Sequence, residues 1–327
     1  TDISRAPDGR LWVATNVGAA VWDGQAWRSY YAPPRAPEWW GSVNTLLPRA
    51  DGGIVLGTDG GGLGFYTGRD FTGLTDERER PAEWAQIRPP ITALLYRDTG
   101  ELWAATDGGG VSRLTATEWQ VYIPNATLAA EVTALAATEG RLWLGIKTGR
   151  VAVEPVGDSC RFAAVEPSAW VNDALRDDQG DVWLAMDGEG VLRLSDGAEP
   201  ARELTGDIQR LALSPNGELW FADDRQPWLL RARPSGGDDA WSRLPLDLSL
   251  STPNIDTTTV LAVGPDLDLW LGGSTYEHRG LVRFSGGQWS HLTTADGLAD
   301  NWVLEVVVAP DGAVWVATYG GLSRYEP

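Results

Sequence analysis

The sequence contains few of the side chains that usually carry chemistry. Its 327 residues include one cysteine, one methionine and two histidines. The single cysteine, Cys160, excludes an intrachain disulfide. The two histidines, His278 and His291, form no cluster with the spacing of a metal site. The sequence also lacks a Gly-x-Ser-x-Gly nucleophile elbow. We therefore predict no catalytic residues, no metal site and no cofactor.

Long apolar runs and an excess of positive charge are also missing. No run approaches the ~20 apolar residues of a membrane-spanning helix, so we expect no membrane contact by this domain. The 45 acidic and 26 basic residues give a formal net charge of −19. Such a charge repels a phosphate backbone and argues against a nucleic-acid partner. The chain begins Thr1-Asp2-Ile3, with neither an initiator methionine nor a signal peptide, and we expect a domain excised from a larger protein.

Tryptophan and glycine, in contrast, are abundant, with 18 and 39 residues. Much of this abundance comes from a Gly-x-Leu-Trp motif that occurs in eight diverged copies. Its tryptophan position is occupied by Trp12, Val55, Trp103, Trp143, Trp183, Trp220, Trp270 and Trp315. The steps between these positions are 43, 48, 40, 40, 37, 50 and 45 residues. A period near this length is typical of β-propellers, in which each repeat is one four-stranded blade.

Each repeat divides into four candidate strands joined by short turns. An apolar inner strand, such as 132–136 or 304–308, precedes the Leu-Trp strand. A third strand follows, as at 111–114 and 281–284, and then a more polar outer strand, as at 27–30 and 289–292. We predict an all-β fold: one closed β-propeller over residues 1–327, with eight blades of four antiparallel strands in preference to seven blades. The eighth repeat ends after its third strand, so the strand that closes the ring is not apparent.

The repeated tryptophans have a structural explanation. A large aromatic side chain at one position of every blade fills the wedge between neighbouring twisted sheets. Each such side chain buries about 200 Å² and contributes several kcal/mol at ~25 cal/mol/Å². We therefore expect the motif tryptophans to be packing residues rather than ligand contacts.

The third and eighth copies carry a family resemblance. The third copy runs from Ile91-Thr92-Ala93-Leu94 to Val111-Ser112-Arg113-Leu114, and the stretch Asp296-Gly297-Leu298-Ala299-Asp300-Asn301 precedes the eighth. These residues resemble the two-component regulator propeller family over essentially the whole chain. The resemblance implies a propeller that serves as the extracytoplasmic sensory part of a bacterial hybrid histidine kinase or related regulator. Copies four and six depart from the pattern at 147–149 and 223–227, which lack the paired glycines.

The connections that differ between repeats are the predicted seat of recognition, because loops vary freely on a repeated scaffold. The long, unlike segments 31–43, 73–90, 244–258 and 273–279 are expected on one face. The candidate ligand-binding residues are aromatic, acidic and amide side chains in or beside such connections: Glu38, Trp39, Trp40, Trp84, Trp170, Asn172, Tyr276, Asn301, Trp302 and Tyr319. The alternative is that these aromatics seal the ends of the blades. The acidic turn residues Asp59, Asp107 and Asp187 are expected to bond turn amides rather than calcium.

Three functional hypotheses follow. The favoured one is a non-catalytic ligand- or protein-binding sensor module, located outside the cytoplasm, with a small molecule, glycan or protein as partner on the loop-rich face. The second is a propeller enzyme, either a glycoside hydrolase or a lyase, that uses the same face. The third is a scaffold that recruits a protein through its rim. The scarcity of histidine and the missing nucleophile motif favour the first and third hypotheses.

Overall fold

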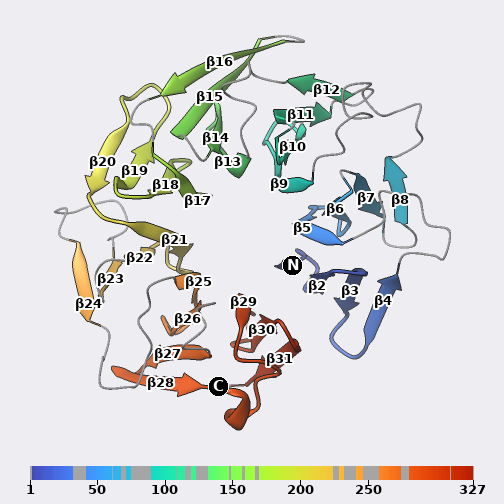
Figure 1. The fold of residues 1–327 in the computed structure, drawn as a ribbon, viewed down its shortest axis with the longest axis vertical. Coiled ribbons are helices and arrows are strands. Elements are labelled where there is room, and N and C mark those ends of the chain that lie inside the picture. The colour runs from blue at the N-terminus through green and yellow to red at the C-terminus, as the bar shows by residue number, and fades with distance from the viewer. Residues whose placement is uncertain are drawn as a thin grey trace. The chain divides into compact units, whose positions relative to one another are not determined.

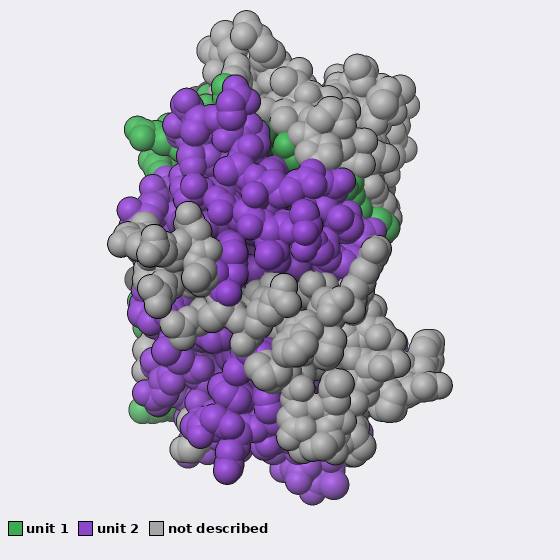
Figure 2. Space-filling view, turned by 90° about the vertical axis from the view of Figure 1, so that its left-hand side faces the viewer, with its two compact units in different colours: residues 1–171 green, residues 172–327 purple. Residues whose placement is uncertain are grey.

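The computed structural model divides into two compact units, Thr1–Val171 and Asn172–Pro327, which are considered separately (Figure 2). It describes residues 2–31, 42–60, 62–67, 71–74, 90–108, 110–114, 119–122, 132–146, 149–156, 159–165, 169–223, 228–231, 241–245, 258–273, 280–309 and 311–326. Within these ranges the regular structure is β, apart from one 3-10 turn.

The first unit contains four antiparallel sheets, each with four strands in chain order (Figure 1). The first sheet comprises β1 (Ile3–Arg5), β2 (Leu11–Thr15), β3 (Gly18–Trp22) and β4 (Trp27–Tyr31). The second comprises β5 (Val43–Pro48), β6 (Ile54–Thr58), β7 (Leu63–Tyr66) and β8 (Phe71–Leu74). The third comprises β9 (Ile91–Tyr96), β10 (Leu102–Thr106), β11 (Gly110–Leu114) and β12 (Trp119–Tyr122). The fourth comprises β13 (Val132–Ala137), β14 (Leu142–Ile146), β15 (Gly149–Val156) and β16 (Ser159–Val165).

The second unit continues the same pattern. Its first sheet, which begins at the last residue of the first unit, comprises β17 (Val171–Arg176), β18 (Val182–Met186), β19 (Gly190–Leu194) and β20 (Ala201–Leu204). The next comprises β21 (Ile208–Leu213), β22 (Leu219–Asp223), β23 (Trp228–Arg231) and β24 (Ser242–Pro245). The third comprises β25 (Thr258–Val263), β26 (Leu269–Gly273), β27 (Leu281–Ser285) and β28 (Gln288–Leu292). Among the described residues the last sheet has three strands, β29 (Val303–Val308), β30 (Val314–Thr318) and β31 (Gly321–Tyr325), preceded by the 3-10 turn η1 (Thr294–Asp296).

The predicted division of each repeat into strands is confirmed. The eight motif copies all lie on the second strand of a sheet, and the inner strand predicted at 132–136 is β13. The third strands predicted at 111–114 and 281–284 are β11 and β27, and the outer strands predicted at 27–30 and 289–292 are β4 and β28. Strand periodicity and turn glycines were therefore sufficient to place the elements.

The interpretation of the motif tryptophans as packing residues is also confirmed, since all seven are buried. Trp12 clusters with Leu46, Ile54 and Tyr66 of the following sheet, and Trp103 clusters in the same way with Val132 and Leu142. Each of these indoles therefore fills the space between its own sheet and the next one, as the wedge argument requires.

Arginines on the third strands cover several of these tryptophans. The Arg283 guanidinium lies 5.1 Å from the Trp270 ring centroid, and Arg193 lies 5.6 Å from the Trp183 ring. The register explains this repetition, because each arginine is the direct cross-strand partner of its tryptophan. A cation over an aromatic face within ~6 Å is attracted by the ring quadrupole. The arginines thus stabilise the scaffold as well as adding charge.

Polar side chains near the start of the inner strands link successive sheets. Asn44, Thr92, Thr133 and Asn172 each donate a hydrogen bond to the carbonyl of the first residue of the next inner strand, at 3.4, 2.7, 2.7 and 2.9 Å. These side chains add directional contacts between sheets to the apolar packing. Each bond is worth about 1 kcal/mol.

Candidate functional site

Five of the predicted site residues lie outside the described part of the chain: Glu38, Trp39, Trp40, Trp84 and Tyr276. They stay predictions. The structure does place Trp170, Asn172, Asn301, Trp302 and Tyr319.

Trp170 and Asn172 flank the first residue of β17. Trp170 is 43% exposed, so its ring is open to a partner. The Asn172 side chain donates to the carbonyl of Ile208 at 2.9 Å, which is the same link that Thr133 makes to Val171. One amide N–H of Asn172 therefore serves the scaffold. Its predicted role in ligand binding is not tested by this geometry.

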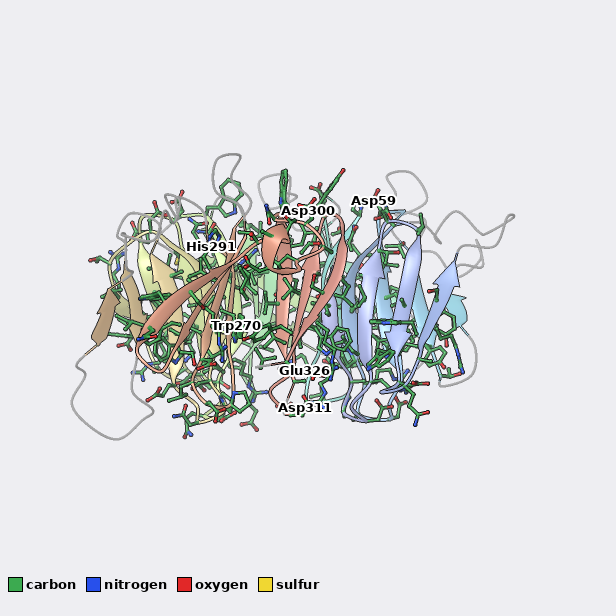
Figure 3. The ribbon with its side chains drawn as sticks, turned by 90° about the horizontal axis from the view of Figure 1, so that it is seen from below. Asp59, Trp270, His291, Asp300, Asp311 and Glu326 are labelled. Carbon is green, nitrogen blue, oxygen red and sulfur yellow. The ribbon has the colours of Figure 1, made fainter. Side chains whose placement is uncertain are left out.

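Asn301, Trp302 and Tyr319 come together at one end of the last sheet. Figure 3 shows Asp300 at this end and Asp311, in the turn between β29 and β30, at the opposite end. The Tyr319 amide donates to the Trp302 carbonyl at 3.0 Å. The two ring centroids lie 6.0 Å apart with an interplanar angle of 33°. Tyr319 is 78% exposed, whereas Trp302 is partly buried, so the pair presents an open aromatic surface on a packed base.

The connection that carries Trp302 is held in place by local hydrogen bonds. Thr293 and Asp296 form a capping box around η1. The Thr293 hydroxyl accepts a hydrogen bond from the Ala295 amide, and the Asp296 carboxylate accepts one from the Thr293 amide. The Asn301 Oδ1 atom accepts from the Thr294 amide at 2.6 Å, and the Ser323 hydroxyl accepts from the Ala299 amide at 2.8 Å. The main chain beneath the aromatic pair is therefore fixed before any ligand arrives.

Gly320 allows the turn after β30 to approach this connection closely. A Cβ atom at position 320 would lie 2.9 Å from both the Ala299 carbonyl oxygen and the Asp300 Cβ atom. Real Cβ atoms are not found so near a backbone oxygen, and the turn would have to move away to make room. Glycine at this position thus fixes Tyr319 beside Asp300.

The electrostatics at this end are one-sided. The connection 293–302 contains the carboxylates of Asp296 and Asp300 and neither lysine nor arginine. Asp300 accepts a hydrogen bond from the Trp302 amide at 2.7 Å through Oδ1. Hydrogen bonds from the backbone and side chain of Thr293 lower the pKa of Asp296, so it remains ionised to lower pH than a free aspartate. The aromatic pair consequently lies in a region of negative charge.

Other sheets share the backbone of this site but not its side chains. Asp59 donates its amide to the Ser42 carbonyl at 2.8 Å, and Asp107 donates to the Pro90 carbonyl at 3.0 Å. These contacts match the bond from Tyr319 to Trp302, because each joins the residue after a second strand to the residue before an inner strand. An aromatic pair at positions where sibling repeats carry serine, proline or aspartate is not required by the fold. Trp170 likewise precedes an inner strand, β17, but Asp187 stands there at the position of Tyr319, so the sheet of β17 carries only one of the two rings.

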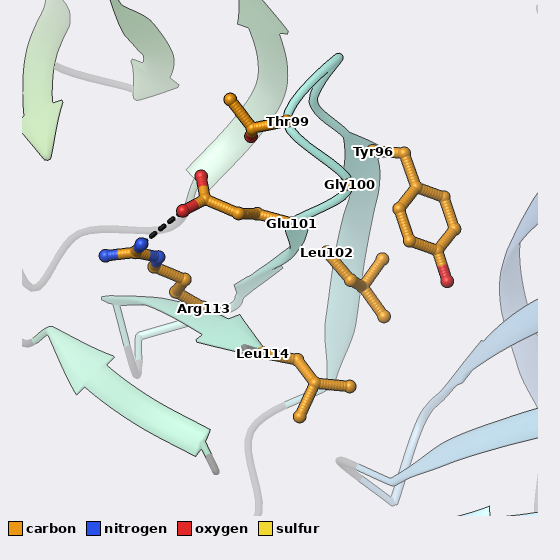
Figure 4. Close-up of a pocket in the computed structure, with 7 residues that line it drawn as sticks. All are labelled: Tyr96, Thr99, Gly100, Glu101, Leu102, Arg113 and Leu114. Carbon is orange, nitrogen blue, oxygen red and sulfur yellow. Dashed lines mark hydrogen bonds and ion pairs between the residues drawn. The ribbon is translucent and has the colours of Figure 1, made fainter. Parts of the chain in front are cut away.

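No pattern in the sequence predicted the cavity of about 290 Å³ in the third sheet (Figure 4). Its described lining residues are Tyr96, Thr99, Gly100, Glu101, Leu102, Arg113 and Leu114. Glu101 and Arg113 form an ion pair in which both side chains are largely buried. Burial raises the pKa of the Tyr96 hydroxyl, so it stays protonated. A ligand would have to compete with the ion pair for these polar groups, and the apolar walls formed by Tyr96, Leu102 and Leu114 remain the principal surface offered to it.

The described residues contain neither a metal-binding cluster nor a membrane-spanning helix. Within the described ranges, no group of three or more histidine, cysteine, aspartate or glutamate side chains could hold a metal ion. In the same part of the chain, no helix has the length and apolar character needed to cross a membrane.

The strands, their register and the repeated tryptophan packing define a β-propeller-like all-β repeat fold. No protein-family model matches the sequence. No curated protein matches it either.

Three solved structures illustrate the proteins that share this type of fold. The extracellular domain of a protein assigned to a hybrid two component system of B. thetaiotaomicron is 17% identical, with a TM-score of 0.54 over 99% of this chain and 51% of that one. PorZ, a surface component of the type-IX secretion system of Porphyromonas gingivalis, is 14% identical, with a TM-score of 0.64 over 99% of this chain and 46% of PorZ. Virginiamycin B lyase from Staphylococcus aureus is 11% identical, with a TM-score of 0.61 over 97% of this chain and 98% of the lyase.

These similarities confirm the type of fold that the sequence resemblance implied. The chain spans about half the length of the two B. thetaiotaomicron extracellular domains that it matches. At such identities the likeness concerns the fold alone, because one fold hosts many functions.

Proposed function

We propose that this chain is a non-catalytic recognition module of a bacterial signalling protein, located outside the cytoplasm, and that its ligand contacts the Tyr319 end of the last sheet. The observation that carries this proposal is the exposed Trp302–Tyr319 pair on a hydrogen-bonded base. Aromatic rings with one open face give large contact area at a low entropic cost, which suits a binding site. The extracellular origin of the similar B. thetaiotaomicron domains supports the location, and the assignment of one of them to a hybrid two component system supports the signalling role.

We further propose that the sheets are the blades of one closed eight-bladed propeller over residues 1–327. Supporting this arrangement, the described strands form eight sheets in chain order. Motif tryptophans such as Trp12 and Trp103 pack against the following sheet. Small-angle X-ray scattering tests the arrangement. A closed ring predicts the profile of a single flat disc, whereas two units that move independently would give a larger radius of gyration and contradict closure.

The binding proposal is tested by a thermal-shift screen of glycans, peptides and small metabolites against the purified chain. For any ligand that raises the melting temperature, Tyr319→Ala should weaken binding at least tenfold. Asn16→Ala is the matched control, since Asn16 occupies the corresponding exposed turn position of the first sheet. The control should bind as the unaltered protein does. Trp39→Ala and Trp84→Ala would examine the predicted residues outside the described ranges.

Three results would replace this proposal. Turnover of a bound ligand, measured by mass spectrometry, would favour the enzyme hypothesis, which the fold of virginiamycin B lyase also supports. Binding that is indifferent to Tyr319→Ala would move the site away from the last sheet. Recovery of a specific protein partner without any small ligand would favour the scaffold hypothesis.

A further inference from the structure

The second unit contains an internal example of how a tryptophan, a tyrosine and an aspartate hold a cation. Arg283 lies over the Trp270 ring at 5.1 Å and over the Tyr325 ring at 5.4 Å. Its Nε atom donates to Asp268 Oδ2 at 3.0 Å, and its Nη1 atom donates to the Tyr325 hydroxyl at 2.9 Å. The two rings are 5.4 Å apart. A guanidinium is satisfied here by two aromatic faces and one carboxylate.

The Tyr319 end presents the same three kinds of side chain on the surface. Trp302 and Tyr319 are 6.0 Å apart, a spacing close to that of Trp270 and Tyr325. The Asp300 Cβ atom lies within 2.9 Å of the place where a Cβ of Gly320 would be, so the carboxylate is next to the turn that carries Tyr319. Asp300 uses Oδ1 for the Trp302 amide, and its negative charge remains available to a ligand.

The two groups differ in the angle between their rings, 62° inside and 33° at the surface, and in their charge. The internal group contains its own cation, whereas the segment 292–323 that builds the surface group carries no lysine or arginine. Tyr319 remains 78% exposed, so its face is accessible from solvent. Asp296 adds a second carboxylate to the same connection, and the net charge of the chain is −19. Both the local and the overall field therefore attract cations and repel anions.

Resting on the proposed function, we infer that the Tyr319 end binds an exposed arginine or lysine side chain of a partner peptide. The cation lies against the Tyr319 ring, and Asp300 supplies the counter-charge. A cation–π contact with the exposed ring and a charge-assisted hydrogen bond to the carboxylate both favour a cationic side chain. A neutral sugar could stack on the same rings but would gain nothing from the carboxylate charge, and an anionic ligand would be repelled.

The experiment compares the peptide acetyl-Gly-Gly-Arg-Arg-Gly-Gly-amide with a twin in which citrulline replaces arginine. Citrulline keeps the shape of arginine and removes its charge. Isothermal titration calorimetry at low salt should show binding of the arginine peptide and at least tenfold weaker binding of its twin. Binding should weaken about tenfold in Tyr319→Ala and in Asp300→Asn. It should change less than threefold in Tyr319→Phe, which keeps the ring, and in the control Asn16→Ala.

Salt and a neutral probe complete the test. Raising the salt to 0.5 M should weaken the arginine peptide through screening, and this dependence should be reduced in Asp300→Asn. Equal binding of the citrulline twin would overturn the inference. So would Tyr319-dependent binding of a neutral oligosaccharide with none of the arginine peptide, although the proposed recognition function would then stand. If no glycan, peptide or metabolite showed Tyr319-dependent binding, both the inference and the proposed site would be wrong.

Discussion

The turn after the second strand is closed in the same way in the first and last sheets. In the first, the Thr15 hydroxyl donates to the Gly18 carbonyl at 3.0 Å, and Gly18 has a φ of 141°. In the last, Thr318 donates to Gly321 at 2.7 Å, and Gly321 has a φ of 143°. The two residues between these anchors differ completely. A threonine and a glycine thus suffice to close the turn, which leaves its tip free to acquire a binding role.

The tips differ in their neighbours as well as in their side chains. The first turn carries Asn16 and Val17, and Val17 is 53% exposed. The last turn carries Tyr319 and Gly320, and Gly320 packs against Ala299. The second tip position of the first turn, 17, accepts a side chain, whereas the same position of the last turn, 320, has no room for one. The last turn is therefore specialised by its contact with the preceding connection.

The largest combined effect that we expect, on stability and on ligand binding together, comes from abolishing this difference. Gly320→Val introduces atoms where the Ala299 carbonyl already lies, and overpacking of this kind costs about 2 kcal/mol. The same change should displace Tyr319 and weaken ligand binding. Urea denaturation measures the loss of stability. The reciprocal variant Val17→Gly is the control and should lower the free energy of unfolding by less than about 1 kcal/mol. Equal losses in the two turns would show that the contact of Gly320 with Ala299 is unimportant.

A change at the shared anchor should affect both turns alike. Gly18→Ala and Gly321→Ala place a side chain at a positive φ that is essentially confined to glycine, at a cost of about 1–3 kcal/mol each. We expect the two losses in free energy of unfolding to agree within about 0.5 kcal/mol. Chemical denaturation of both variants checks this. A much larger loss in only one of them would mean that the turns are not equivalent.

How far the sequence predicts this molecule depends on whether a feature is repeated. The strands and the burial of Trp103 or Trp270 follow from period, turn chemistry and the size of the indole, which act alike in every copy. The pairing of Trp302 with Tyr319 could not be derived in this way. These residues are 17 positions apart, and their contact depends on the register of β29 with β30. The cavity beside Leu102 and Leu114 arises from packing between side chains that occupy ordinary repeat positions, so no pattern marks it.

Asn172 distinguishes a scaffold role from a binding role. If its main task is the bond to Ile208, Asn172→Ala should lower the free energy of unfolding by about 1 kcal/mol. Thr133→Val removes the equivalent bond to Val171 and should cost a similar amount. Ligand affinity, measured well below the melting temperature, should be unchanged in both variants. A loss of affinity confined to Asn172→Ala would restore the predicted role of this residue in binding.

The smallest effects concern two aspartates of the second unit whose pKa values shift in opposite directions. Burial raises the pKa of Asp173, whose carboxylate accepts from the Leu211 amide at 3.0 Å, whereas hydrogen bonds from Thr293 lower the pKa of exposed Asp296. A raised folded-state pKa means that the folded protein binds the proton more tightly than the unfolded chain does. The stability of the protein relative to Asp173→Asn should therefore increase as the pH falls from 7 towards 4.

For Asp296 the sign is reversed, because the folded protein binds its proton less tightly than the unfolded chain. The stability that this aspartate contributes through the capping box is present above its usual pKa of 3.8 and is lost as the pH falls further. Urea denaturation of the protein and of the variants Asp173→Asn and Asp296→Asn, at a series of pH values, measures the contribution of each aspartate. The free energy of unfolding of each variant is subtracted from that of the protein, and the other titrating groups cancel in this difference. If the two differences changed with pH in the same direction, Asp173 in the inner strand β17 and Asp296 in η1 would not differ in their electrostatic environment. Opposite slopes would show that burial dominates at Asp173 and that hydrogen bonds to the ionised carboxylate dominate at Asp296.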